Sequence, residues 1–223
     1  MRKLLSATAM LFSVLMLAAC TSLGASLHPV TEIQTVWEID DIPPWQVEED
    51  LCADGASASP YELPDGPDHF ICEFPDEGVR ACALDGVGDS VTCIVGGVGH
   101  KMIRFDSPTA AAGLELEEYD GEPQPLSVRL EDGKYCWPML PGAREFWVNE
   151  DYSAPPGMTV WYECTKGYNL ISPSGPAETF TRGERWTVQL WPQDTEGMDY
   201  PIQPETVGVK SARFADHEHP TLP

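Results

Sequence analysis

Short apolar runs separated by turn residues dominate the first half of the chain after residue 31. The runs have the length of strands, are rich in apolar or β-branched residues, and cover residues 36–39, 70–74, 79–84, 91–95 and 102–105. Asp-Gly pairs at residues 54–55, 65–66 and 85–86 are turn signals between them. The two runs on either side of the glycine-rich loop at 85–89 predict a hairpin.

The second half repeats this pattern with stronger strand signals. Its runs cover residues 126–130, 134–137, 159–164, 168–171, 186–191 and 207–215, and the sequence TVWYEC at 159–164 has the strongest β character. Turn signals at 131–133 and 166–167 predict two hairpins. We find no helix of three turns and therefore expect a mainly β fold. An antiparallel, disulfide-stapled sandwich or barrel fits best, either as one sheet system or as two small β subdomains.

A proline-flanked acidic segment at residues 108–125 separates the two halves. It contains three consecutive alanines, which allow one short helical turn, and then five acidic residues. We interpret it as a connector between a cysteine-rich β half at 32–107 and a tryptophan-rich β half at 126–215. Residues 216–223 are polar and end in proline, so we expect a flexible tail.

The amino terminus has the features of a secretory signal at residues 1–19. Arg2 and Lys3 precede an apolar run of about 16 residues, which is shorter than the roughly 20 that a transmembrane helix needs. The run ends in Leu-Ala-Ala followed by Cys20, which resembles the lipobox of bacterial lipoproteins. The resemblance implies a diacylglycerol on Cys20, a lipidated tether at 20–31 and a position on the extracytoplasmic face of the cell membrane.

Cysteine number and spacing predict disulfides. Lipidation of Cys20 would leave six cysteines in an oxidising compartment, and no Cys-x-x-Cys pair indicates a metal site. Two cysteines lie far from the other four, which favours a Cys136–Cys164 bridge. Of the pairings open to the remaining four, we favour Cys52–Cys72 with Cys82–Cys93, because the last two lie on opposite arms of the predicted hairpin.

The charge of the chain limits its partners. The net charge of −23 becomes −25 once Arg2 and Lys3 are removed with the signal. Such a protein has no general attraction for nucleic acid, so we expect no nucleic-acid partner. Cations, basic polymers and basic proteins are the partners that such a charge would suit, but we favour a strongly hydrated, soluble surface as its explanation.

Motifs for catalysis are weak. Ser172 lies in Ser-Pro-Ser-Gly, which lacks the first glycine of a nucleophile elbow, and the glycine-rich run at 95–100 follows a predicted strand and indicates a loop. His69 and His100 have no evident orienting partner. Alternating acidic and histidine residues at 216–219 offer only adventitious metal binding. We therefore expect no enzymatic activity, no cofactor and no dedicated metal site.

Five tryptophans fall in the second half and offer a different chemistry. Exposed indole rings stack on sugars or anchor protein partners. Trp161 and Trp186 lie on predicted strands and should fill the core. Trp147 lies beside charged residues and Trp191 precedes a proline, so we expect these two to be exposed and to be candidates for ligand binding.

Four short motifs in the second half resemble secreted lipoproteins of actinobacteria, a mostly uncharacterised group. The motifs are LEDGKYC at 130–136, WYEC at 161–164, RGERWTVQL at 182–190 and VGVKSARFA at 207–215. The resemblance covers about 85 residues, and the stretch after Cys136 departs from the pattern. It implies a cell-envelope setting, supports the Cys136–Cys164 bridge and carries no activity.

These observations together predict a cell-envelope lipoprotein that acts as a non-enzymatic binding or assembly module for an exported partner. The first alternative is a module that binds cell-wall glycan through exposed tryptophans. The second alternative is an envelope hydrolase.

Overall fold

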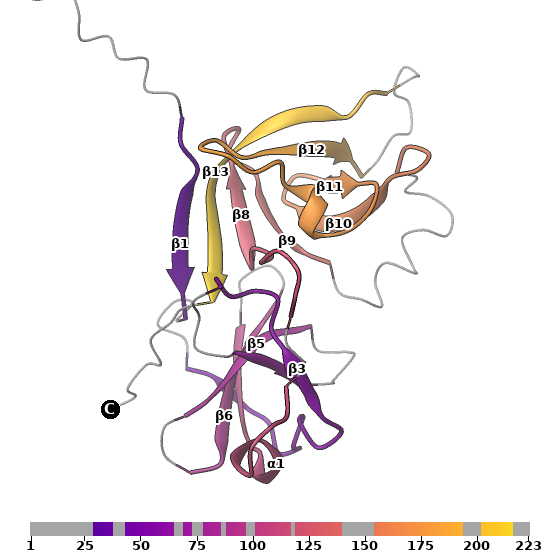
Figure 1. The fold of residues 1–223 in the computed structure, drawn as a ribbon. Helices are drawn as coiled ribbons and strands as arrows, with labels where there is room; N and C mark the ends of the chain where they lie inside the picture. Colours follow the sequence, from indigo (N-terminus) through magenta and orange to yellow (C-terminus); the bar gives the residue numbers. More distant parts are fainter. Residues whose placement is uncertain are drawn as a thin grey trace, which may run out of the picture.

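The computed structural model describes residues 29–37, 43–64, 69–72, 78–85, 88–96, 101–116, 119–139, 154–193 and 202–215. Two β-sheets contain almost all of the regular secondary structure in this part of the chain, one closed and one open, and they lie one above the other in Figure 1. The predicted mainly β class is confirmed.

The closed sheet is a six-stranded antiparallel barrel formed by the second half. Its strands follow the order β13-β12-β11-β10-β9-β8, and pairing of β13 with β8 closes the ring. Each strand is thus paired on both sides, which leaves few edges for association with other chains. The strands are β8 (Ser127–Leu130), β9 (Tyr135–Pro138), β10 (Thr159–Cys164), β11 (Tyr168–Ser172), β12 (Thr187–Pro192) and β13 (Glu205–Ala215).

A strand from the start of the described chain joins this barrel. β1 (Glu32–Val36) runs parallel to β13, beside which it lies in Figure 1. Two strands share one edge of the long β13. Its first four residues pair with β12, and its last five pair with β1. Thr31 lies at this division. Its hydroxyl donates to the carbonyl of Val209 and accepts from the amide of Trp186, both at 2.7 Å.

The first half forms an open six-stranded sheet with the order β2-β7-β6-β5-β4-β3. β2 runs parallel to β7, and the other neighbours are antiparallel. The strands are β2 (Trp45–Gln46), β3 (Ala56–Ala58), β4 (Phe70–Cys72), β5 (Val79–Leu84), β6 (Ser90–Val95) and β7 (Lys101–Asp106). The one-turn helix α1 (Pro108–Ala111) follows, with Ser107 as its N-cap, and matches the short helical turn expected there.

Each sheet has its own core. The barrel interior is filled by aliphatic and aromatic side chains, including Tyr162, Leu170 and Phe214, none of which is measurably exposed. Burial raises the pKa of Tyr162 well above its usual value, so its hydroxyl keeps its proton and donates to the carbonyl of Pro125 at 3.0 Å. The open sheet packs Leu51, Phe105 and its four cysteines into a second cluster.

A third cluster joins the two sheets. Trp37, Tyr61 and Ile94 pack there with Leu126 and the last residue of β13. Arg80 of β5 is 5% exposed and bridges the same junction. One of its guanidinium nitrogens donates to the Tyr61 hydroxyl, and another donates to the carbonyls of Pro138 and Met139. The two sheets are therefore held together by apolar contact and by a buried cation.

The three expected disulfides are present. Cys52 pairs with Cys72, Cys82 pairs with Cys93 across β5 and β6, and Cys136 pairs with Cys164 across β9 and β10. The 3-10 turn η1 (Ala177–Thr179) is the other helical element that the structure describes. Among the described residues, no helix has both the length and the apolar character needed to cross a bilayer.

Candidate binding pocket at the junction of the two sheets

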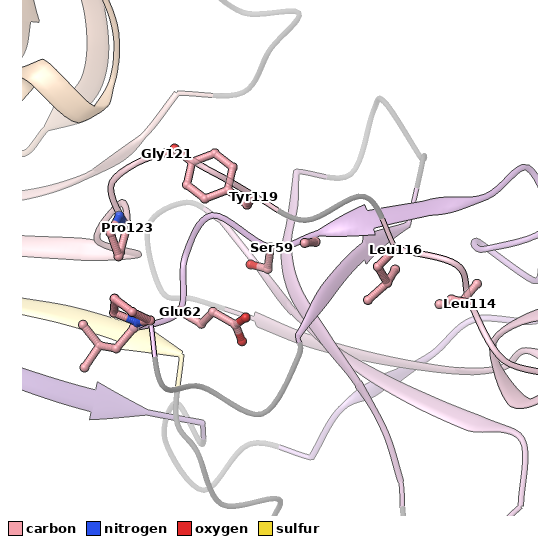
Figure 2. Close-up of a pocket in the computed structure, with 10 residues that line it drawn as sticks. Ser59, Glu62, Leu114, Leu116, Tyr119, Gly121 and Pro123 are labelled. Carbon is pink, nitrogen blue, oxygen red and sulfur yellow. The ribbon is translucent and has the colours of Figure 1, made fainter.

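A pocket of about 630 Å³ opens where the barrel and the open sheet meet. This volume lies within the range typical of small-ligand sites. One wall comes from the segment after β3 and the other from the acidic connector after α1, as Figure 2 shows. The lining residues are Ala58, Ser59, Glu62, Leu63, Pro64, Leu114, Leu116, Tyr119, Gly121 and Pro123.

Backbone pairing fixes the wall that carries Glu62. Glu62 forms a parallel bridge with Ala215 at the end of β13, and the Ala215 amide donates to the carbonyl of Tyr61 at 2.8 Å. The amide of Gln124 donates to the carbonyl of Pro60 at 2.6 Å. The barrel therefore holds this segment in place against the connector.

The Glu62 carboxylate is held by His69. One carboxylate oxygen, Oε2, accepts from the His69 amide at 2.8 Å and lies 2.9 Å from the His69 ring nitrogen Nδ1. The imidazole is 1% exposed and stacks on Trp37 with 4.8 Å between ring centroids. No described residue donates to the other oxygen, Oε1. The buried histidine therefore orients a carboxylate that keeps one oxygen for a ligand.

Ser59 lines the pocket beside Glu62, but its hydroxyl is already used. Its Oγ donates to the carbonyl of Arg80 at 2.8 Å and accepts from the Tyr61 amide at 3.2 Å. A serine nucleophile needs a hydroxyl that donates to a general base. Ser59 donates to a backbone carbonyl instead, so its contacts are those of a structural residue.

The connector supplies the opposite wall. Tyr119 donates through its hydroxyl to the carbonyl of Glu122 at 3.2 Å and accepts from the side-chain amide of Gln124 at 3.0 Å. Arg182, in the segment between η1 and β12, donates to the carbonyl of Pro123 and lies 3.3 Å from the Glu122 carboxylate. A methyl group on Gly121 would lie 2.4 Å from the Tyr119 hydroxyl, so glycine is needed for the tyrosine to lie where it does.

Figure 2 shows how these walls combine. The Glu62 carboxylate extends into the space that has Tyr119 and Pro123 on one side and Leu114 and Leu116 on the other. Among the described lining residues Glu62 is the one acidic or basic residue, and it is accompanied by apolar side chains. This arrangement suits a ligand that brings a cationic or hydroxyl donor together with an apolar part.

Trp191 does not lie where the sequence predicted. It is 5% exposed on β12, so the expectation that it is exposed is wrong, because its place on the barrel strand covers the ring. Trp186 is buried in the barrel core as expected, and Trp161 is partly buried against that core. Cys20, Trp147, His100 and the segment 216–219 lie outside the described residues.

Sequence reasoning considered His69 but found no orienting partner for it, and it missed both Glu62, which is that partner, and one exposed aromatic residue. Glu62 and His69 are seven residues apart, with no pattern that pairs them. Trp45 of β2 is 57% exposed, with the Lys101 ammonium 4.1 Å from its ring centroid. Its place directly after Pro43-Pro44 was the only signal for exposure.

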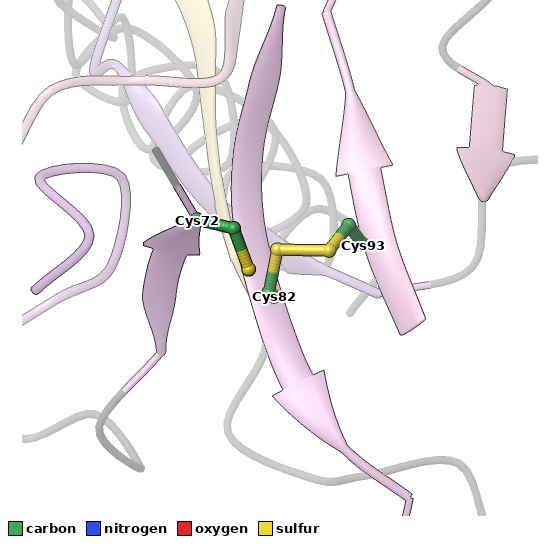
Figure 3. Close-up of side chains that lie close together, drawn as sticks. All are labelled: Cys72, Cys82 and Cys93. Carbon is green, nitrogen blue, oxygen red and sulfur yellow. A yellow bond between two sulfur atoms is a disulfide. The ribbon is translucent and has the colours of Figure 1, made fainter. Parts of the chain in front are cut away.

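Three sulfur atoms meet within the open sheet. The Sγ atoms of Cys72, Cys82 and Cys93 lie within 4.8 Å of one another, and Figure 3 shows Cys72 beside the Cys82–Cys93 bridge. Each of the three is already in a disulfide, whereas a metal ligand must be a thiolate. In this oxidised form the cluster is a pair of adjacent disulfides.

No protein-family model, no curated protein and no solved structure matches the chain. The chemistry of the pocket therefore rests on its own residues.

Proposed function

We propose that this protein is a non-enzymatic binding module of the cell envelope that receives a basic segment of an exported partner in the pocket of Glu62. The supporting observation is the Glu62 carboxylate, which His69 orients and which faces Leu114 and Leu116. A peptide segment with a lysine or arginine next to an apolar side chain matches both features. The net charge of the chain favours approach of a basic partner.

Site-specific cross-linking on intact cells tests this proposal. A photoreactive residue at position 116 should capture one dominant exported protein through a basic segment, identified by mass spectrometry of the cross-linked peptide. Glu62→Gln should reduce capture about tenfold, because a charge-assisted hydrogen bond contributes roughly 1.5–3 kcal/mol. Glu205→Gln, which removes an equally negative but exposed residue at the start of β13, should leave capture unchanged.

Two outcomes would contradict the proposal. Capture that is equal in wild type and Glu62→Gln would show that the pocket carboxylate does not recognise the partner. Turnover of an envelope substrate that disappears in Glu62→Gln would make the protein an enzyme, with Glu62 as its acid or base.

The membrane attachment belongs to the same proposal. Cys20 and its Leu-Ala-Ala cut support a lipid anchor on the extracytoplasmic face of the membrane. Two or three acyl chains would hold the protein firmly, since each buried methylene contributes about 0.8 kcal/mol. Cys20→Ala should move the protein from the membrane fraction to the soluble fraction. An unchanged distribution would refute the lipid anchor but would not bear on the proposed role of the Glu62 pocket.

Glycan binding remains a second candidate, supported by the exposed ring of Trp45. Titration with soluble wall fragments, followed by tryptophan fluorescence, distinguishes the two functions. A saturable change that is lost in Trp45→Ala but kept in Glu62→Gln would favour glycan. A flat signal with every fragment would count against it.

A further inference from the structure

A second pocket, of about 430 Å³, lies on the outer face of the barrel, where β1, β13 and β8 run side by side (Figure 1). The described residues that line it are Glu32, Gln34, Ser127, Arg129, Gly133, Tyr135, Lys210, Ser211 and Arg213. None of them belongs to the junction pocket.

Strand register explains why these residues gather. Ser211 pairs with Glu32 on one side and with Arg129 on the other, and Arg129 in turn pairs with Tyr135. Arg213 pairs with Gln34 and Ser127 in the next row that faces the same way. Because side chains alternate across a strand, Val128 of β8 and both Ala212 and Phe214 of β13 point into the barrel instead, and all three are buried.

The floor and the walls of the pocket have a simple origin. Ser127 and Ser211 are short, buried side chains, and the longer arginines stand beside them. Lys210 comes from a β-bulge, since the register of β13 with β8 shifts between Val209 and Ser211. A bulge re-aims the side chain of the extra residue. Without the bulge, the regular alternation of side chains along β13 would point Lys210 into the barrel. With it, the lysine lies on the outer face and lines the pocket.

The charge of the pocket is opposite to that of the protein. Removal of Arg2 and Lys3 leaves eleven basic residues in the chain, and three of them line this one pocket. None of the three forms an ion pair with a described residue. Glu32 is the one carboxylate among the described lining residues, so the lining carries a net charge of about +2.

Nearby acids do not neutralise this charge, because they pair with other bases. Glu131 accepts two hydrogen bonds from Arg185, and Asp132 pairs with Lys134. Arg129 and Arg213 are diagonal neighbours on adjacent strands, a relation that places their backbones about 7–8 Å apart. Their like charges repel each other, and an anion bound between them would offset this repulsion.

We propose that this pocket binds the phosphate group of an anionic ligand between Arg129, Arg213 and Lys210, above the hydroxyls of Ser127 and Ser211. Two planar guanidinium groups and an ammonium group offer more charged donors than the two oxygens of a carboxylate can use. A phosphate has oxygens on all sides and can accept from several strands at once. The phosphate can come from a soluble phosphate ester or from a phospholipid headgroup.

Calorimetric titration of the full chain with glycerol phosphate, in a neutral detergent at low salt, tests the proposal. We expect saturable binding that weakens as salt is raised. Arg129→Gln and Lys210→Gln should each weaken it about tenfold, by loss of a charge-assisted hydrogen bond. Both residues are exposed, so neither change threatens the fold. Glu32→Gln should strengthen binding about twofold to fivefold, because it removes the opposing charge.

Lys101→Gln is the matched control, since Lys101 is also an exposed strand lysine but lies on the open sheet. It should bind as wild type does. Equal affinity in wild type, Arg129→Gln and Lys210→Gln would overturn the proposal, and so would the lack of any saturable binding by wild type. Either result leaves the proposal for the Glu62 pocket unaffected, because that proposal is tested with a different ligand and different variants.

A second arm separates the two sources of phosphate. The same titration is repeated with the protein on vesicles of a neutral lipid to which either phosphatidylglycerol or oleate is added, at equal negative surface charge. Weaker glycerol phosphate binding with phosphatidylglycerol than with oleate supports the headgroup as ligand, since it competes for the pocket. Equal binding on both vesicles supports a soluble phosphate ester.

Discussion

At the scale of single residues, Thr31 has the most clearly defined structural role. Its buried hydroxyl donates to Val209 and accepts from Trp186 at the point where β13 changes partner from β12 to β1. Thr31→Val keeps the shape but leaves a buried carbonyl and amide without that partner. We expect the free energy of unfolding to fall by about 1–3 kcal/mol in denaturant titration.

Thr35→Val is the matched control for this change. Thr35 lies on the same strand, and its hydroxyl makes no hydrogen bond to a described residue. Its substitution should alter stability by no more than about 0.5 kcal/mol. Equal effects of the two substitutions would show that the Thr31 hydroxyl does not stabilise the division of β13.

The ionisation of Asp50 should make the stability of the fold depend on pH. Burial alone would raise its pKa, but hydrogen bonds from Ser107, from the Cys52 amide and from Thr109 outweigh burial and lower the pKa below its ordinary 3.8. A lowered pKa in the folded state means that the ionised side chain stabilises the fold above pH 3.8. This contribution is lost as the pH falls through the folded-state pKa.

Asp50→Asn should therefore be less stable than wild type at neutral pH, and the difference should shrink as the pH falls below 3.8. Urea unfolding of both proteins across this range measures the difference directly. Asp106→Asn removes one exposed carboxylate from the neighbouring strand and controls for the change in net charge. A difference that stays constant over the whole range would contradict the prediction.

At the scale of elements, the disulfides should differ in their contribution. Cys136–Cys164 closes a separation of 28 residues and Cys82–Cys93 one of 11. By restricting the unfolded chain, the first disulfide should stabilise the fold by about 3.5 kcal/mol and the second by about 2.7 kcal/mol. Cys136→Ala/Cys164→Ala should thus lower the unfolding free energy more than Cys82→Ala/Cys93→Ala does. The reverse order in denaturant titration would refute this account.

Most strands were predictable because their signals are local. The predicted ranges 79–84 and 159–164 coincide with β5 and β10, and several others differ by one or two residues at the ends. β2 and β3 were missed because they are only two and three residues long. The run predicted at 36–39 lies partly outside the described residues and overlaps only at Val36 with β1, which covers Glu32–Val36. Its pairing with β13 supplies hydrogen bonds that no local pattern reveals.

The candidate site was not predictable for the same physical reason. Glu62 and His69 lie on either side of the connection between β3 and β4, two strands of only three residues each. The segment of Glu62 is then fixed by its pairing with Ala215, more than 150 positions away in the sequence. The predicted boundary segment turned out to form a wall of the pocket, because Arg182 holds it there. The disulfide pairs were within reach because cysteine spacing and hairpin arms are local signals.

At the scale of the whole molecule, Arg80 controls how firmly the two sheets are joined. Arg80→Met leaves the Tyr61 hydroxyl and two barrel carbonyls without their buried donor. We expect a loss of about 1–3 kcal/mol in unfolding free energy, even though removal of a buried charge offsets part of the cost.

Arg80→Lys separates geometry from charge. It keeps the cation, but a single ammonium group cannot span the hydroxyl and the carbonyls as the planar guanidinium does. It should therefore recover only part of the stability that Arg80→Met loses. Wild-type stability of Arg80→Met would show that apolar contact alone joins the sheets.

The parallel pairing of β1 with β13 also determines how the protein would respond to mechanical tension. A tether to a membrane would pull on the amino end of β1, whereas a partner bound beside Glu62 would pull near the carboxyl end of β13 (Figure 1). Opposed forces at these two ends slide parallel strands along each other, so the hydrogen bonds between Glu32 and Val36 and their partners share the tension. The fold would resist being pulled between membrane and partner better than it would resist peeling of β1 from the side.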